Sequence, residues 1–414
     1  MSFFLINQIR QLAKFDPDAK KLIAADGIIS LTSGFMYTDF SVYLNQMGYD
    51  PLRIGFLLSL STLTASFLTL FAAGLSDKFG RRRIIIAGFF PMFIGTLIYT
   101  VTFSYSFLIV AAVLNGISFA SIGSSFMALL TEKTKPENRN SVFATSSLMN
   151  GLAMTTSMVI GGLPPVIATY FHVTTFDSFR PLFAFGLFCE IAAFLVFYGV
   201  RENYKGKDKI SFLPKKASKF VIKLSILGFI GLGAGMVVEL FPLWFYLKFG
   251  INVNSIGPLF AASMLLTSLA SFLTPEIAKK FGNVKTIAYT EATSITILAV
   301  LPFASIYLAA PLFVIRNILM NMSSPIMNSF IMGIIPEEER ATSSAIIGLF
   351  DSIPRSFGPA LGGYFFNLGD LPAPFLIAAT LYSVSIGFFF ELFKSVESKG
   401  HGAINKNIPK PIGD

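Results

Sequence analysis

The chain has 414 residues, of which 53% are hydrophobic and only 13% are charged, and its formal net charge is +9. A soluble domain carries about a quarter of its residues as charged side chains, so this composition excludes an ordinary soluble protein and makes lipid the main solvent. One cysteine (Cys189) and two distant histidines (His172 and His401) exclude a disulfide framework, a metal site built on them and a triad-type enzyme. We therefore expect no catalytic residue, no metal and no cofactor.

Apolar stretches of about 20 residues, each suited to crossing the hydrocarbon as a helix, follow one another along the chain. The residues before the first stretch carry mixed charges and lack a small-residue cleavage site, so the first span acts as its own insertion signal. The predicted fold is an all-α membrane protein with twelve transmembrane helices. The predicted spans are 22–44, 53–76, 84–103, 107–130, 141–169, 180–200, 221–247, 254–275, 286–304, 309–335, 341–368 and 372–393.

Basic residues are distributed unevenly between the loops. With both ends of the chain in the cytoplasm, most Lys and Arg fall in cytoplasmic segments, while Arg53, Arg180 and Lys248 fall outside. This orientation follows the positive-inside rule, which the opposite orientation would break. The excess of basic residues is therefore a sign of membrane topology, and it adds a modest attraction to anionic lipid. We expect no nucleic-acid partner. The predicted location is the cell membrane, crossed many times.

The loop between the second and third spans packs four cations around one acid and two glycines. It reads Gly-Leu-Ser-Asp-Lys-Phe-Gly-Arg-Arg-Arg and must be a tight, water-facing loop at the membrane edge. This pattern resembles the loop between helices 2 and 3 of the major facilitator superfamily of transporters. The resemblance implies two pseudo-symmetric six-helix bundles around a central cavity, working by alternating access. The matching residues are Gly74, Asp77, Lys78, Gly80, Arg81 and Arg82.

The same resemblance implies that this loop takes part in gating. Asp77 would meet the start of the helix at 341–368, where the helix dipole favours an acid. Arg81 would reach Glu132 at the cytoplasmic end of the fourth span. The predicted gating residues are Gly74, Asp77, Gly80, Arg81 and Glu132.

The chain also repeats itself at a nearly constant offset. Gly48 and Gly55 recur as Gly250 and Gly257, as expected of two parallel halves. A monomer is favoured, since the cavity would lie within one chain. The predicted domains are an N-terminal six-helix bundle at 1–200, a cytoplasmic linker at 201–220, a C-terminal six-helix bundle at 221–394 and a cytoplasmic tail at 395–414.

Ionisable side chains inside the membrane cost roughly 2.5–3.5 kcal/mol each on insertion scales and are candidates for function. Asp39 and Glu239 lie at similar depth in the first helix of each half, and the resemblance places both helices at the central cavity. A carboxylate there can bind and release a proton as the cavity opens to either side. We predict that both couple transport to protons. The alternative for Asp39 is that it marks the wet outer end of its helix. Pro242 would loosen the helix beside Glu239.

A polar stripe marks the tenth span, where Asn317, Asn321 and Asn328 share one helical face beside the cation Arg316. Such a face lines water, substrate or another helix, so the alternative to a cavity is an interhelical seam. Arg316 would bind a substrate carboxylate or hold Asp39 or Glu239 ionised. The predicted substrate-binding residues are Tyr37, Asn115, Asn150, Trp244, Arg316, Asn317, Asn321 and Asn328.

Asp351 and Arg355 are four residues apart, the spacing of a local ion pair, and we predict that they form one inside the membrane. Glu190 lies in the middle of the sixth span, and the pattern assigns it no role.

The chain has no Gly-x-x-x-x-Gly-Lys-(Ser/Thr) loop, so ATP is not the predicted energy source. The run from Met322 to Thr342 resembles drug-efflux-like members of the superfamily. We predict a secondary active transporter, and not an enzyme, that exports hydrophobic or cationic compounds against protons, with sodium left open as the coupling ion. One alternative is a proton symporter that imports a small polar metabolite or an organic anion. From another class, the alternative is a non-transporting sensor or a lipid scramblase. The expected partners are a small-molecule substrate, protons and membrane lipid.

Overall fold

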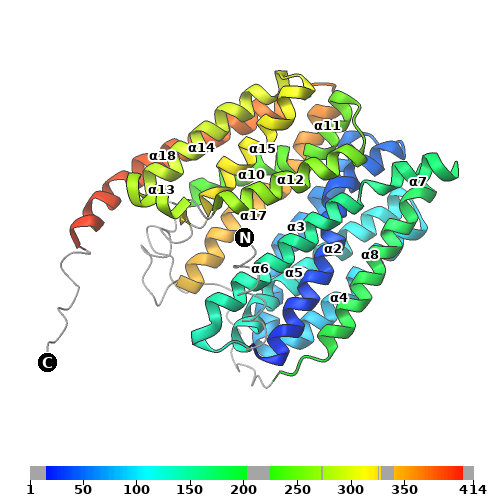
Figure 1. Cartoon of the computed structure of the whole chain (residues 1–414), viewed down its shortest axis with the longest axis horizontal. Coiled ribbons are helices and arrows are strands. Elements are labelled where there is room, and N and C mark those ends of the chain that lie inside the picture. The colour runs from blue at the N-terminus through cyan, green and yellow to red at the C-terminus, as the bar shows by residue number, and fades with distance from the viewer. Residues whose placement is uncertain (1–14, 203–223, 272–273, 325, 328–339, 404–414) are drawn as a thin grey trace. The chain divides into compact units, whose positions relative to one another are not determined.

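The computed structural model describes residues 15–202, 224–271, 274–324, 326–327 and 340–403. Within these ranges the regular elements are helices (Figure 1). The α-helices are α2 (Pro17–Gln46), α3 (Pro51–Phe79), α4 (Arg81–Val101), α5 (Tyr105–Glu132), α6 (Arg139–Ile160), α7 (Leu163–Phe171), α8 (Thr175–Tyr198), α10 (Gly228–Val237), α11 (Phe241–Phe249), α12 (Val253–Ser271), α13 (Thr274–Phe281), α14 (Asn283–Val300), α15 (Ile306–Met322), α17 (Arg340–Asn367) and α18 (Ala373–Ala403).

The predicted all-α membrane fold is confirmed, and the twelve predicted spans correspond to these helices in chain order. In the described ranges, nine spans are long and apolar enough to cross a membrane by length and composition. The other three correspond to α2, α15 and α17. The helices α2 and α17 carry acids or cations inside the span, and α15 is short because it ends at Met322.

One predicted span, 141–169, is divided into α6 and α7. The division falls at Gly161 and Gly162, and Pro164 follows in the first turn of α7. A proline in the first turn of a helix loses no intrahelical hydrogen bond and has a suitable φ. The glycines end one helix, and the proline begins the next.

The span predicted at 221–247 is divided in the same way, into α10 and α11. The two helices are joined by the 3-10 turn η3 (Val238–Leu240), which contains Glu239. Pro242 lies in the first turn of α11. The helix expected to be loosened beside Glu239 is interrupted here, and the acid itself lies in the turn.

The helices form two compact units. In the first unit, α2 packs against α6 and α8, and α5 packs against α3 and α4. In the second unit, α14 packs against α15 and α18. The predicted division into two six-helix bundles stays a prediction. The first unit comprises Met1–Leu213, Ala234–Leu265 and Arg355–Leu371, and the second comprises Pro214–Gly233, Leu266–Pro354 and Pro372–Asp414.

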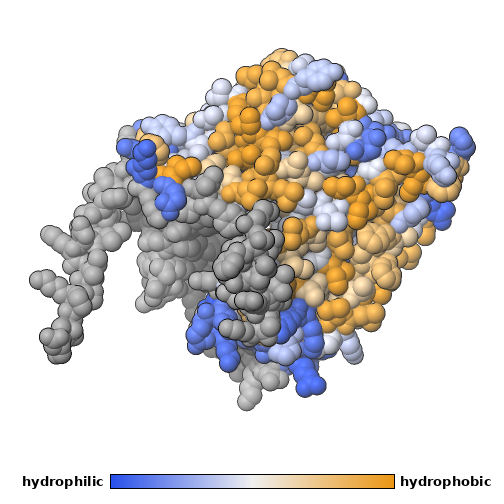
Figure 2. All heavy atoms as spheres, in the orientation of Figure 1, coloured by the Kyte–Doolittle hydropathy of each residue, from blue (hydrophilic) through white to orange (hydrophobic). Residues whose placement is uncertain are grey.

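Large apolar side chains lie on the surface of the first unit. Phe67, Phe119, Phe188 and Leu195 are each more than half exposed. Figure 2 shows many hydrophobic residues on the visible face of the first unit around α8, and hydrophilic residues near helix ends. A surface of this kind suits contact with lipid chains and would associate in water.

Candidate functional site

Asp39 is fully buried in α2, which excludes the alternative that it is a wet helix end. Thr38 Oγ1 donates a 2.7 Å hydrogen bond to Asp39 Oδ1, while Oδ2 has no hydrogen-bond partner in the described ranges. The carboxyl lies against Gly161, where a Cβ would come within 2.8 Å of Oδ1. The glycine at the α6–α7 break therefore makes the space that this carboxyl occupies. Burying an ionised carboxylate without a cation is costly, so the geometry suits a protonated Asp39.

Glu239 is half-buried in η3, and the residue before it contacts α2. Tyr37 Oη donates a 3.3 Å hydrogen bond to the carbonyl oxygen of Val238, the residue before Glu239. The charge of Arg355 on α17 acts on Glu239. Sequence reasoning missed this cation as a partner of Glu239, because their proximity depends on the close packing of α10 on α17. That packing is marked by Gly235, where a Cβ would lie 3.0 Å from the carbonyl carbon of Arg355.

Helices of the two sequence halves meet closely in the first unit, in what we call the outer seal. Ala360 N donates a 2.8 Å hydrogen bond to Ser59 Oγ, and it joins α17 to α3. Gln46 Nε2 donates a 3.1 Å hydrogen bond to Asn252 Oδ1. At Gly55, a Cβ would lie 2.9 Å from the carbonyl carbon of Pro359. In the predicted orientation these are extracellular helix ends, and in this structure they are in contact.

Two polar side chains on α6 bond to α2. Asn150 Nδ2 donates a 2.7 Å hydrogen bond to Ser30 Oγ, and Ser146 Oγ donates a 3.3 Å hydrogen bond to Asp26 Oδ2. Asn150 thus lies in an interhelical seam between α2 and α6. Its role in substrate binding stays a prediction.

Two other predicted binding residues are engaged within the first unit. Asn115 Nδ2 donates to Tyr99 Oη at 3.2 Å and to the carbonyl oxygen of Ala111 at 3.0 Å. Trp244 is fully buried, and its ring centroid lies 4.9 Å from that of Phe245. A substrate would reach this indole only after the helices around it separate.

The predicted stripe on α15 is present in part. Arg316 is 2% exposed, and its guanidinium donates hydrogen bonds to Asn317 Oδ1 (3.0 Å) and Tyr382 Oη (3.5 Å). Asn321 is exposed, and its Nδ2 donates a 2.8 Å hydrogen bond to the carbonyl oxygen of Asn317. Asn328 lies outside the described residues.

The residues of the loop between α3 and α4 have the predicted local geometry. Gly80 has a φ of 98°, in the region that favours glycine, and Arg81 Nη1 donates a 2.7 Å hydrogen bond to Glu132 Oε2. The expected contact between Arg81 and Glu132 is therefore present. Gly74 is buried and Asp77 is half-buried, and the gating role of all five residues stays a prediction.

Sequence reasoning missed Glu202, which follows α8. Its Oε1 accepts a hydrogen bond from Arg81 N at 2.8 Å, and its Oε2 accepts one from Arg82 N at 2.9 Å. These are the first two backbone N–H groups of α4, which have no partner inside the helix. Glu202 lies in a basic segment that is distant in sequence from the loop around Gly80, and no local sequence pattern connects the two.

Asp351 and Arg355 are both half-buried, one turn apart on α17, and their ion pair stays a prediction. Glu190 is 2% exposed on α8 and accepts a 2.7 Å hydrogen bond from Thr96 Oγ1 on α4. It therefore joins two helices of the first unit.

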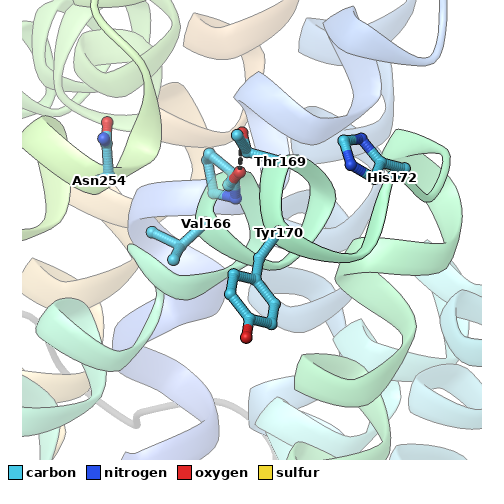
Figure 3. Close-up of a pocket in the computed structure, with 6 residues that line it drawn as sticks. Val166, Thr169, Tyr170, His172 and Asn254 are labelled. Carbon is cyan, nitrogen blue, oxygen red and sulfur yellow. Dashed lines mark hydrogen bonds between the residues drawn. The ribbon is translucent and has the colours of Figure 1, made fainter.

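A shallow recess of about 570 Å³ lies in the first unit, between α7 and the start of α12. Figure 3 shows the Tyr170 ring pointing away from Thr169 and His172, with Asn254 across from Val166. None of the described residues that the sequence predicts for binding lines this recess. It is an open hollow at the ends of these helices.

The sequence pattern of the Major Facilitator Superfamily matches residues 23–359 and 224–412. Multidrug resistance protein 1 of Bacillus subtilis is 22% identical over 352 residues, covering 83% of this chain and 88% of that protein. The quinolone resistance protein NorA of Staphylococcus aureus is 22% identical over 368 residues, covering 85% of this chain and 90% of NorA. The crystal structure of a bacterial homologue of the iron transporter ferroportin, in the inward-facing state, superposes with a TM-score of 0.74. It is 13% identical and covers 90% of this chain and 98% of that one.

Proposed function

Because this chain belongs to the Major Facilitator Superfamily, whose members are transporters, we propose that it exports hydrophobic or cationic compounds in exchange for protons by alternating access. The observation that carries the proposal is the buried carboxyl of Asp39, which lies against the break between α6 and α7 and has one oxygen without a hydrogen-bond donor among the described residues. The multidrug and quinolone resistance relatives support this cargo class.

The position of Asp39 links its proton to the outer seal. An ionised carboxylate needs water or a cation, and closure of the helices around Asp39 removes the water. A proton that binds Asp39 from outside therefore favours the sealed arrangement. Release of that proton follows when the site gains access to water from the cytoplasm.

Glu239 supplies the second coupling acid of the proposal. It lies in a helix break and under the charge of Arg355, so its ionised form has a nearby cation. Exchange of this cation for a positively charged cargo would link binding to coupling, because both compete for one carboxylate. The buried rings of Trp244 and Phe245 would add apolar and cation–π contacts once exposed.

The gate of the proposal is the loop around Gly80. The Arg81–Glu132 link and the fixed loop geometry hold α4 to α5 at the cytoplasmic end. A surface ion pair contributes about 0.2–1 kcal/mol of stability. Loss of this contact would therefore change the relative stability of the two conformations of the transporter.

The test is movement of a fluorescent lipophilic cation in proteoliposomes under an imposed pH gradient. We expect gradient-driven accumulation by the wild type, loss of coupling in Asp39→Asn and in Glu239→Gln, and unchanged transport in the control Glu137→Gln, whose side chain is exposed. Reversal of the gradient should reverse the net movement of the cation.

Two results would overturn the proposal. Absence of cation movement by folded, correctly oriented wild type would contradict the cargo class and favour import of a polar metabolite or an organic anion. Undiminished coupling in both acid variants would contradict the assignment of the acids.

A further inference from the structure

A buried acid on α14 has no part in the proposed mechanism. Glu291 is 4% exposed and lies midway along this helix. Ser323 Oγ donates a 3.3 Å hydrogen bond to Oε1, while Oε2 has no hydrogen-bond partner in the part of the chain that the structure describes. A carboxylate oxygen in this position would be both desolvated and unbonded, which is costly.

A cation lies close to this acid without bonding to Oε2. The charge of Arg316 on α15 acts on Glu291, and its side chain is equally buried. Its guanidinium donates to Asn317 Oδ1 and to Tyr382 Oη. Ser294 Oγ donates a 3.2 Å hydrogen bond to the carbonyl oxygen of Arg316 and so fixes α14 against α15.

On the other elements packed against α14, most of the titratable groups that the structure describes are exposed. Of the titratable groups described on them, α18 contributes the buried Tyr382 at the guanidinium and carries Glu391 at an exposed position. On α13, Glu276 and Lys280 are exposed. The 3-10 turn η4 (Leu301–Phe303) has no charged residue.

We propose that Oε2 of Glu291 is a proton-binding site in the second unit, with Arg316 as the counter-charge after the proton leaves. While the proton is bound, the carboxyl is neutral and the guanidinium stays on Asn317 and Tyr382. When the proton passes to solvent, the buried carboxylate attracts the guanidinium, because a charge-assisted hydrogen bond then offsets desolvation.

This movement of the guanidinium connects proton binding at Glu291 to the polar stripe on α15. Movement of the guanidinium toward Glu291 releases Asn317 Oδ1, whose amide then becomes available to another partner. This is a third proton-binding carboxyl beside Asp39 and Glu239. It depends on neither the cargo nor the direction of transport.

The experiment is infrared difference spectroscopy of the purified full chain in lipid nanodiscs, titrated from acidic to alkaline pH in H₂O and D₂O. We expect a protonated-carboxyl band in the wild type that is missing in Glu291→Gln and retained in the control Glu276→Gln. In Arg316→Gln the band should persist to higher pH, because that variant lacks the cation that stabilises the ionised form.

Two results would overturn the proposal. A wild-type spectrum identical to that of Glu291→Gln at every pH would show that Glu291 stays ionised. A band that is absent in the wild type and appears in Arg316→Gln would show a permanent ion pair. If Glu291→Gln does not fold, Glu291→Asp keeps the carboxyl, and a proton-binding site predicts a shift in the frequency of the same band. No cargo is present, so the result is separate from the test of export.

Discussion

Glu202 caps the helix that begins at Arg81. The two carboxylate oxygens accept hydrogen bonds from the backbone N–H groups of Arg81 and Arg82, at 2.8 and 2.9 Å. A negative charge at a helix N-terminus is favoured by the helix dipole. The start of the segment that follows α8 is therefore fixed to the loop that we propose as part of the gate.

Replacement of Glu202 by alanine should destabilise the protein by about 1–2 kcal/mol, because it removes a helix cap. The single tryptophan, Trp244, is fully buried, and its fluorescence can report thermal unfolding in detergent. The matched control is Glu137→Ala, an exposed acid in the 3-10 turn η1 (Pro136–Asn138). Equal unfolding temperatures for the two variants would contradict the capping role.

Replacement of Gly80 by alanine should also destabilise the protein, for two reasons. The φ of 98° strains an L-residue, and a Cβ would lie 2.9 Å from Oε2 of Glu202. Gly123, in the interior of α5, has open space around its Cβ position, so Gly123→Ala should be neutral or stabilising by about 0.5–1 kcal/mol. Unfolding temperatures measured in parallel test the contrast, which fails if both variants shift in the same direction.

The space at Gly161 should be required for coupling. A Cβ at this position would lie 2.8 Å from Oδ1 of Asp39, so Gly161→Ala should displace the carboxyl and reduce proton-driven transport several-fold. Gly151, on α6, has nothing within 4 Å of its Cβ position, and Gly151→Ala should transport as the wild type does. Transport rates under one pH gradient compare the pair. Normal coupling in Gly161→Ala would contradict the link between the helix break and Asp39.

Acid should weaken a contact at the N-terminal end of α2. Burial raises the pKa of Asp18, but the hydrogen bonds from Lys21 and from the backbone N–H of Arg201, with the charges of Lys21 and Lys133, lower this pKa below its ordinary value of 3.8. A lowered pKa in the folded state gives stability that is fully present above pH 3.8 and is lost as the pH falls through the folded-state pKa.

The measurement is the unfolding temperature of wild type and Asp18→Asn across this range. We expect the wild type to be the more stable protein near neutral pH and the difference to vanish in acid. A difference that stays constant with pH would mean that the carboxylate charge has no part in the contact.

The sequence by itself determined the membrane class and the order of the spans, because apolar length and loop charge are local properties of the chain. The Arg81–Glu132 contact was implied by the resemblance of the ten-residue loop to the transporter superfamily, and the structure contains this contact. The sequence also marked Asp39 and Glu239 as candidates for function, since acids within apolar spans are rare. Pro242 indicated a loosened helix beside Glu239.

Only the tertiary structure decided what each side chain contacts. Asp39 faces Gly161, Glu202 caps α4, and Arg316 binds Asn317 and Tyr382 although the stripe on α15 favoured a cavity. A polar stripe specifies a helix face, and it does not specify whether that face meets a cavity or another helix. Partners far apart in the chain are set by packing, because hydrogen bonds inside the membrane form wherever neighbouring helices bring donors and acceptors together.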